Sequence, residues 1–256
     1  MVNNKADDFK ADHRKVVREW ELEQVIGFFP PGCSVLEIGA GAGWQAKCLA
    51  DRGFKVTAID IAQSRYHQIQ EWPVIDYDGF RIPLEDQSVD VVFSSNVLEH
   101  IPHIDEFMVE MRRVLRPGGI AVHVMPTTLW RFVTCVTFYF RRFKQFLPKK
   151  NKLESPVSVA KGSKGSPQRG ILHKLNAVLF PTLHGVRGNV LSEHYFFSKF
   201  FWQRTFIRAR WKVIGMQGAG LLYSGYRVFG FLLPLSIRHR LAKIVGSSCR
   251  IYIAVM

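Results

Sequence analysis

Residues 34–43 read SVLEIGAGAG, and this stretch decides the fold class. The apolar segment 34–38 has the length of a short strand and runs directly into a loop in which Gly39, Gly41 and Gly43 alternate with alanine. A helix is predicted to follow over 44–52. Glycine permits a tight turn and lets a ligand approach bare backbone near a helix start. This order is typical of nucleotide-binding α/β proteins, although an open α/β sheet of any function can contain such a turn.

Strands and helices alternate on both sides of this loop. Further apolar segments are predicted to be strands at 55–60, 74–78, 89–94 and 120–125. Helices are predicted over 14–29, 62–71 and 105–115, and Arg116-Pro117-Gly118-Gly119 is predicted to close the last of them. Strands that are apolar on both faces and separated by helices indicate a parallel, doubly wound sheet.

Two acidic residues stand at the carboxyl ends of successive strands. Asp60 follows Gly39 by 21 positions, which is the spacing at which an acid reaches the hydroxyl groups of a ribose. Asp78 ends the next strand, where it can accept a hydrogen bond from an adenine amino group. Because the carboxyl ends of parallel strands meet at one edge of a sheet, these acids are expected at a common ligand site. The alternative for each acid is a solvated turn.

The residues around the glycine loop favour one class of cofactor over another. A dinucleotide-binding loop has the pattern GxGxxG, but the sixth position here is the bulky Trp44. Glu37 precedes the glycines, and its carboxylate would repel a pyrophosphate but attract an ammonium group. We therefore expect a nucleoside that carries an amino acid, and not NAD.

These segments resemble the class I S-adenosylmethionine-dependent methyltransferases, in particular the type 11 family. The resemblance runs from Val35 to about Met125, through VLEIGAGAG (35–43), VTAID (56–60), FRIPLEDQSVDVVFSSNVLEHI (80–101) and MRRVLRPGGIAVHV (111–124). It implies a Rossmann-like, mostly parallel sheet of seven strands whose last strand is antiparallel. The sixth and seventh strands are then expected at 210–216 and 250–255, after a helix at 194–209.

The resemblance also implies a set of residues that bind S-adenosylmethionine. They are Glu37, Gly39, Ala40, Gly41, Gly43, Asp60, Ile61, Asp78, Gly79, Ser94 and Ser95. Glu37, Gly39 and Gly41 would line the methionine and ribose end of the cofactor. Asp60 would bind the ribose hydroxyls, Ile61 would pack on the adenine, and Asp78 would meet the adenine amino group beside Gly79 and Phe80. Ser94 and Ser95 would border the sulfonium and the entry of the substrate.

Three histidines are candidates for a catalytic role. His100, in the segment LEHI, stands at a position frequent in the family, with a structural role at a helix start as the alternative. His184 and the pair Glu193-His194 would have to come together over the methyl donor to act as a base and its partner. His123 lies inside an apolar strand, and we interpret it as a core residue.

The cysteines and the chain start give further expectations. Cys33, Cys48, Cys135 and Cys249 are widely scattered without a CxxC motif or Cys/His cluster, so we predict no metal site, no disulfide scaffold and a reducing compartment. Residues 1–15 are too polar for a secretory signal, and no run of about 18 apolar residues predicts a spanning helix. The expected location is the cytoplasm.

The charge of +14 is unevenly distributed along the 256 residues. Residues 1–126 carry 13 basic and 19 acidic groups, 127–193 carry 12 basic and 2 acidic groups, and 194–256 carry 10 basic groups and no acidic ones. Of the 33 aromatic residues, 21 follow position 126. An acidic first half joined to a basic, aromatic second half favours an anionic partner, such as phospholipid, a phosphorylated substrate or nucleic acid.

We predict three parts: a cofactor-binding part (1–126), a basic aromatic cap inserted at the active site (127–193), and a C-terminal part that completes the sheet (194–256). An amphipathic helix is predicted at the start of the cap, with a stripe of Leu129, Phe132, Val133, Val136, Phe140, Phe143 and Leu147. With its basic residues it indicates an interfacial element; a helix packed on its own domain is the alternative. Residues 151–170 are predicted to be a polar loop, and 219–237 a lipid-facing segment or a dimer contact.

The leading hypothesis is a methyltransferase that acts on an oxygen of an anionic or lipid-linked acceptor, such as a glycan on a polyprenyl carrier, peripherally at the inner membrane face. The segment 184–202 also resembles one in methyltransferases linked to bacterial surface-polysaccharide synthesis. An RNA methyltransferase and a small-molecule or quinone methyltransferase are the enzymatic alternatives, and an inactive cofactor-binding partner subunit is the non-enzymatic one. DNA is not an expected partner, and the sequence leaves the oligomeric state open.

Overall fold

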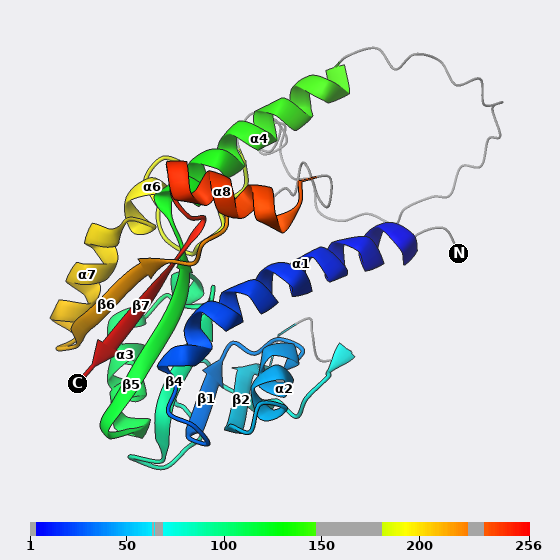
Figure 1. Ribbon diagram of the computed structural model, residues 1–256. Coiled ribbons are helices and arrows are strands. Elements are labelled where there is room, and N and C mark those ends of the chain that lie inside the picture. Colours follow the sequence, from blue (N-terminus) through cyan, green and yellow to red (C-terminus); the bar gives the residue numbers. More distant parts are fainter. Residues whose placement is uncertain (1–3, 63, 65–68, 147–180, 225–232) are drawn as a thin grey trace, which may run out of the picture.

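The computed structural model describes residues 4–62, 64, 69–146, 181–224 and 233–256. At its centre is a seven-stranded sheet with the order β3-β2-β1-β4-β5-β7-β6 (Figure 1). The strands are β1 (Ser34–Ile38), β2 (Lys55–Ile61), β3 (Ile75–Tyr77), β4 (Val89–Ser95), β5 (Leu115–Pro126), β6 (Lys212–Gly218) and β7 (Cys249–Val255). The first five are parallel, whereas β7 runs antiparallel to both β5 and β6. This confirms the predicted Rossmann-like sheet.

The helices cover both faces of this sheet. They are α1 (Asn4–Val25), continued by the 3-10 turn η1 (Ile26–Phe28), α2 (Trp44–Ala50), the 3-10 turn η3 (Leu98–His100), α3 (Ile104–Val114), α4 (Thr128–Phe146), α6 (Glu193–Phe196), α7 (Lys199–Arg208) and α8 (Leu235–Val245). Val91 and Phe93 of β4 contribute to a core with Leu22 of α1, while Val92 contributes to a second core with Phe107 of α3. Alternate residues of one strand therefore serve the two faces, as the pleat of a strand requires.

The boundaries of several elements differ from the prediction. β5 begins at Leu115, so the segment Arg116-Pro117-Gly118-Gly119 belongs to the strand and does not merely close the preceding helix. Leu115 pairs with Val89, and a register shift between Val89 and Val91 accommodates the turn-forming residues within the ladder. The helix expected at 194–209 is two helices, because Ser198 caps α7 by accepting a hydrogen bond from Phe201 N at 3.2 Å.

α4 extends outward from the end of β5 (Figure 1). Its buried residues are Trp130, Arg131, Thr134 and Thr137, whereas Phe132, Val136, Tyr139, Phe140 and Phe143 are exposed. Most of the predicted apolar stripe thus faces outward in the described structure. Among the described residues, no helix has the length and apolarity to span a bilayer. The predicted helix over 62–71 and the segment 219–237 lie partly outside the described residues, and the loop at 151–170 lies wholly outside them.

Candidate functional site

The glycine loop joins β1 to α2 and has a backbone that only glycine adopts easily. Gly39 and Gly43 have φ angles of +69° and +77°. A Cβ atom on Gly39 would lie 2.4 Å from Val97 Cγ2, and one on Gly43 would lie 2.7 Å from Trp72 Cβ. The backbone N–H groups of Gly39 and Ala40 both donate to Ile59 O of β2, at 2.9 and 3.0 Å. The loop is therefore packed tightly against its neighbours before any ligand binds.

Asp60 lies in β2 directly beside this loop. Its Oδ2 accepts a hydrogen bond from Gly41 N at 2.8 Å, and its Oδ1 accepts one from Ile61 N at the same distance. The structure thus brings together the acid and the glycines that the sequence placed at one site. Ile61 is exposed, and a Cβ atom on Gly79 would lie 3.6 Å from its Cγ2. An exposed isoleucine at this position can pack on a flat apolar ring.

Asp78 is exposed and shapes the turn after β3. Its Oδ1 accepts hydrogen bonds from the backbone N–H groups of Phe80 and Arg81, both at 2.8 Å. The bonds from Arg81 and Phe80 lower the pKa of the carboxyl, so the group is a carboxylate at neutral pH. His103, which sequence reasoning missed, anchors this turn: its Nε2 is 2.8 Å from Gly79 O, and its ring stacks on Phe80 with centroids 4.1 Å apart.

Glu37 stands at the end of β1, just before the glycine loop, and is only 2% exposed. Burial raises the pKa of its carboxyl to about 8, against the opposing effect of a hydrogen bond to the backbone at Ala46. Among the described residues, its Oε2 has no hydrogen-bond partner. An unpaired buried carboxylate is costly, and an ammonium group of a ligand would supply the partner. The residues present therefore fit a ligand with an ammonium group, a ribose and a base.

The two serines at the end of β4 have different surroundings. Ser94 is fully buried, and its Oγ lies 2.8 Å from Nδ1 of His123. Its hydroxyl is thus paired within the core. Burial lowers the pKa of His123 to about 3, so this ring is neutral, in agreement with its interpretation as a core residue. Ser95 is partly exposed, and its Oγ accepts a hydrogen bond from Arg18 Nη1 of α1 at 3.3 Å.

A buried polar network connects α1 to the start of β7 beside this serine. Arg18 forms an ion pair with Glu21, whose other oxygen accepts a hydrogen bond from Tyr223 Oη at 2.6 Å. The same hydroxyl lies 3.0 Å from Cys249 Sγ, which in turn donates to Asn96 Oδ1 at 3.4 Å. Sequence reasoning missed this network, because Arg18 and Glu21 have the spacing of an ordinary solvated pair on a helix.

His100, His184 and the buried Glu99 form a second group next to the glycine loop. η3 carries Glu99 and His100 and follows Val97, the residue that packs on Gly39. Glu99 Oε1 lies 3.6 Å from His184 Nε2 and 3.8 Å from His100 Nε2, and the imidazole centroids are 4.8 Å apart. Burial lowers the pKa of His100, and Glu99 partly offsets this effect. The structure thus brings two of the three candidate histidines together, with a carboxylate that the sequence analysis did not single out.

The position of His184 is fixed by a buried ion pair. Glu193 Oε1 accepts hydrogen bonds from the backbone N–H groups of His184 and Gly185, at 2.7 and 2.8 Å. Its Oε2 lies 2.8 Å from Arg131 Nη2, and both side chains are buried. Residues 184 and 185 thus contact Glu193 through their backbone, and a role of this pair over the methyl donor stays a prediction. His194 has another setting: its carbonyl accepts a hydrogen bond from Thr128 Oγ1 at 2.8 Å, and its ring lies outside the group of ligand atoms formed by Glu99, His100 and His184.

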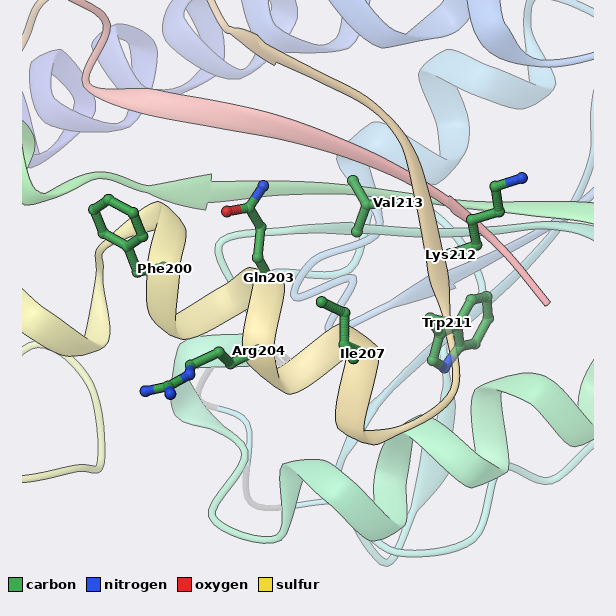
Figure 2. A pocket seen from close by; sticks show the side chains of 7 residues that line it. All are labelled: Phe200, Gln203, Arg204, Ile207, Trp211, Lys212 and Val213. Carbon is green, nitrogen blue, oxygen red and sulfur yellow. The ribbon is translucent and has the colours of Figure 1, made fainter.

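A groove at the edge of the sheet lies between α7 and β6 (Figure 2). It is lined by Phe200, Gln203, Arg204, Ile207, Trp211, Lys212 and Val213. Neither an acid nor a histidine is among these residues, and β6 is the edge strand opposite β3 in the sheet order. We assign no catalytic role to this groove. The glycine loop follows β1, Asp60 lies in β2, and Glu99 and His100 follow β4, away from this edge of the sheet.

Comparison with known proteins shows that this chain is similar to methyltransferases. The family model described as "Methyltransferase domain" matches residues 36–123. An uncharacterized methyltransferase from Mycobacteroides abscessus is 31% identical over 186 residues, which cover 63% of this chain and 70% of that protein. One from Mycobacterium avium is 36% identical over 107 residues, or 39% of this chain and 41% of that protein. The match to the second relative thus spans less than half of its length.

Two solved structures share the fold over nearly their whole length. A SAM dependent methyltransferase from Archaeoglobus fulgidus superposes with a TM-score of 0.53 at 13% identity, covering 97% of this chain and 96% of that one. An S-adenosylmethionine dependent methyltransferase from Mesorhizobium loti gives a TM-score of 0.53 at 14% identity, covering 92% and 97%. At these identities the likeness concerns the fold alone.

Proposed function

The chain belongs to the class I S-adenosylmethionine-dependent methyltransferases, and from this premise we propose that it methylates an oxygen of an anionic or lipid-linked acceptor at the inner membrane surface. In such a reaction the cofactor supplies an electrophilic methyl group on its sulfonium. The protein orients the acceptor, excludes water and removes the acceptor proton. A glycan on a polyprenyl carrier is an acceptor of the proposed kind.

The glycine loop and its acids would hold the cofactor in this proposal. Glu37 would pair with the ammonium of the methionine part, and Asp60 would bind the ribose hydroxyls from its position beside Gly41. Asp78 would accept from the adenine amino group, with Ile61 against the ring. The unpartnered oxygen of Glu37 supports this orientation, because a buried carboxylate favours the cationic end of a ligand.

One observation supports oxygen as the methylated atom: the group of Glu99, His100 and His184 beside the glycine loop. A hydroxyl must lose its proton to become a good nucleophile, whereas a neutral amine attacks directly and loses its proton afterwards. A methyltransferase that acts on hydroxyls therefore needs a group that removes this proton. Since His184 belongs to the proposed cap, 127–193, the cap would complete the active site as well as cover it.

The charge and the exposed aromatic residues support the class of acceptor. The two segments after position 126 carry 22 basic and 2 acidic groups in total. α4 leaves Phe132, Val136, Phe140 and Phe143 exposed in the described structure. Basic groups combined with exposed aromatics suit an anionic lipid surface. Because the same combination suits single-stranded RNA, RNA is the second candidate acceptor.

The test is to incubate the full chain with S-adenosylmethionine labelled in its methyl group and with either a membrane lipid extract or total RNA. We expect label in the lipid fraction, released as volatile methyl iodide when methyl ethers are cleaved with hydrogen iodide or as methanol when methyl esters are hydrolysed. The Asp60→Ala variant should transfer no label, whereas Glu85→Ala, which removes an exposed acid elsewhere, should act like the original protein. Label confined to RNA would overturn the lipid-linked acceptor.

A further inference from the structure

We propose that Glu99, His100 and His184 form a binding site for one divalent transition-metal ion. This inference rests on the proposed function and deepens it, because it assigns a chemical means of removing the acceptor proton. The scattered cysteines led us to predict no metal from the sequence, but the present site uses no cysteine. Each of the three residues contributes one ligand atom, and these atoms lie within 4.8 Å of one another.

Two of the three distances between these atoms are close to those around a bound metal ion. Ligand atoms about 2.1 Å from a tetrahedral zinc ion are separated by roughly 3.4 Å. Glu99 Oε1 lies 3.6 Å from His184 Nε2 and 3.8 Å from His100 Nε2. Shortening these two distances by a few tenths of an ångström would give two of the three pairs of ligand atoms the separation found around zinc. Two imidazoles and one carboxylate suit zinc, manganese, iron or cobalt better than magnesium or calcium.

The state of Glu99 is an independent reason to expect a cation. Its side chain is 1% exposed, and neither of its carboxylate oxygens has a hydrogen-bond partner among the described residues. The imidazole nitrogens at 3.6 and 3.8 Å are too distant for hydrogen bonds. Arg187 lines a small cavity with Glu99, but its guanidinium donates to Ile101 O and Pro102 O. A metal ion bound to all three side chains would neutralise this carboxylate.

The surroundings hold the site in shape while leaving it open on one side. Two hydrogen bonds from the backbone at 184 and 185 to Glu193 fix the loop, and the ring of Trp130 packs on His184 with centroids 4.5 Å apart. The side chains of His100 and His184 remain 41% and 34% exposed. Three protein ligands and an accessible fourth position are the arrangement of catalytic metal sites, whereas structural sites are closed.

The open position would bind the acceptor oxygen. A metal ion lowers the pKa of a coordinated hydroxyl, whose proton passes to water. The resulting oxygen anion forms a bond to the methyl carbon as the carbon–sulfur bond breaks. The electron pair of that bond stays on sulfur, which leaves S-adenosylhomocysteine and the methylated acceptor. The metal ion keeps its charge and its three protein ligands, and departure of the methylated acceptor frees the open position for the next one.

The site can be tested without cofactor or acceptor. The full chain is treated with EDTA, dialysed, and titrated with Zn²⁺ by calorimetry and with Co²⁺ by visible absorption. We expect one ion per chain and the intense visible bands of four- or five-coordinate cobalt. Glu99→Gln and His184→Ala should each weaken binding by at least about 100-fold, because each removes a direct ligand. His194→Ala is the matched control and should bind as the original protein does, and circular dichroism verifies that each variant is folded.

Two outcomes separate this proposal from the proposed function. If the folded chain binds neither ion, or if binding is unchanged in both Glu99→Gln and His184→Ala, the metal site is overturned, whatever the methyl-transfer assay gives. If one ion binds through these residues but no lipid-linked acceptor receives the methyl group, the metal site stands and the proposed acceptor falls.

Discussion

At the scale of single residues, the carboxyl group of Glu37, which is 2% exposed, makes the stability of the folded protein depend on pH. The pKa of Glu37 is about 8 in the folded chain, against an ordinary value of 4.5. Below pH 4.5 the group is neutral in both states. Between pH 4.5 and 8 the unfolded chain loses this proton while the folded chain retains it, so the free energy of unfolding falls as the pH rises through this window.

Glu37→Gln should remove this dependence. We expect the variant to match the original protein near pH 4.5 and to exceed its free energy of unfolding by roughly 2–4 kcal/mol at pH 8, since one pKa unit corresponds to about 1.4 kcal/mol. Urea denaturation at a series of pH values measures the difference. A difference that stays constant between pH 4.5 and 8 would contradict the assignment of a raised pKa to this residue.

The same residue predicts proton release when the cofactor binds. At pH 7 the buried carboxyl of Glu37 is mostly protonated, and an ammonium group beside it would favour the ionised form. We therefore expect close to one proton released per S-adenosylmethionine bound, measured by calorimetry in buffers of different ionisation enthalpy. Glu37→Gln should release none and bind more weakly. An equal proton release from the variant would place the ammonium elsewhere.

At the scale of elements, the buried ion pair between Arg131 of α4 and Glu193 of α6 joins the two ends of the proposed cap. Replacing one partner leaves the other as an uncompensated buried charge, which costs about 3–5 kcal/mol. We expect Arg131→Met or Glu193→Gln alone to lower the free energy of unfolding by that order. The loop at 181–190 should then be cleaved faster by protease.

The double variant Arg131→Met with Glu193→Gln is the control, because it removes the charges together. It should recover part of the loss, and a double-mutant cycle by urea denaturation gives the coupling. Additive effects of the two substitutions would show that the pair does not act as a unit.

Most elements of the sheet could be predicted, because buried parallel strands produce continuous apolar runs, as at 34–38 and 89–94. The start of β5 could not, since Pro117, Gly118 and Gly119 indicate a turn, and only the pairing of Leu115 with Val89 extends the strand through it. The predicted proximity of Asp60 to the glycine loop is present in the structure, because β2 and β1 are neighbours. Glu99 and Arg131 were missed, because charged residues on helical segments are usually solvated, and only the fold shows them buried.

At the scale of the whole molecule, the exposed aromatic face of α4 and the basic second half predict binding to anionic membranes. Vesicles that contain phosphatidylglycerol should bind the full chain at low salt, whereas vesicles of neutral phosphatidylcholine should bind it weakly. Added salt should weaken binding, since charges at a surface are screened beyond about 8 Å at physiological ionic strength. Co-sedimentation measures both effects.

Substitution of two exposed residues tests whether α4 is the contact. Phe140→Glu with Phe143→Glu should reduce vesicle binding at least tenfold, because it places two acids on the face that would meet the lipid. Phe200→Glu with Ile207→Glu adds two acids at exposed apolar positions of α7 and is the matched control. An equal loss in both variants would indicate that net charge alone determines binding.

The contact between Arg131 and Glu193 has a consequence for protein engineering and for evolution. These two residues bracket the segment 132–192, and their ion pair holds its two ends together. Lengthening a loop whose ends are fixed costs little free energy, about 0.6 kcal/mol for each doubling. We therefore expect that the segment 132–192 can be exchanged with that of a relative while the sheet and glycine loop remain intact. Recombination at these two positions would exchange His184 together with the proposed acceptor-facing segment, while Glu99, His100 and the glycine loop stay with the sheet.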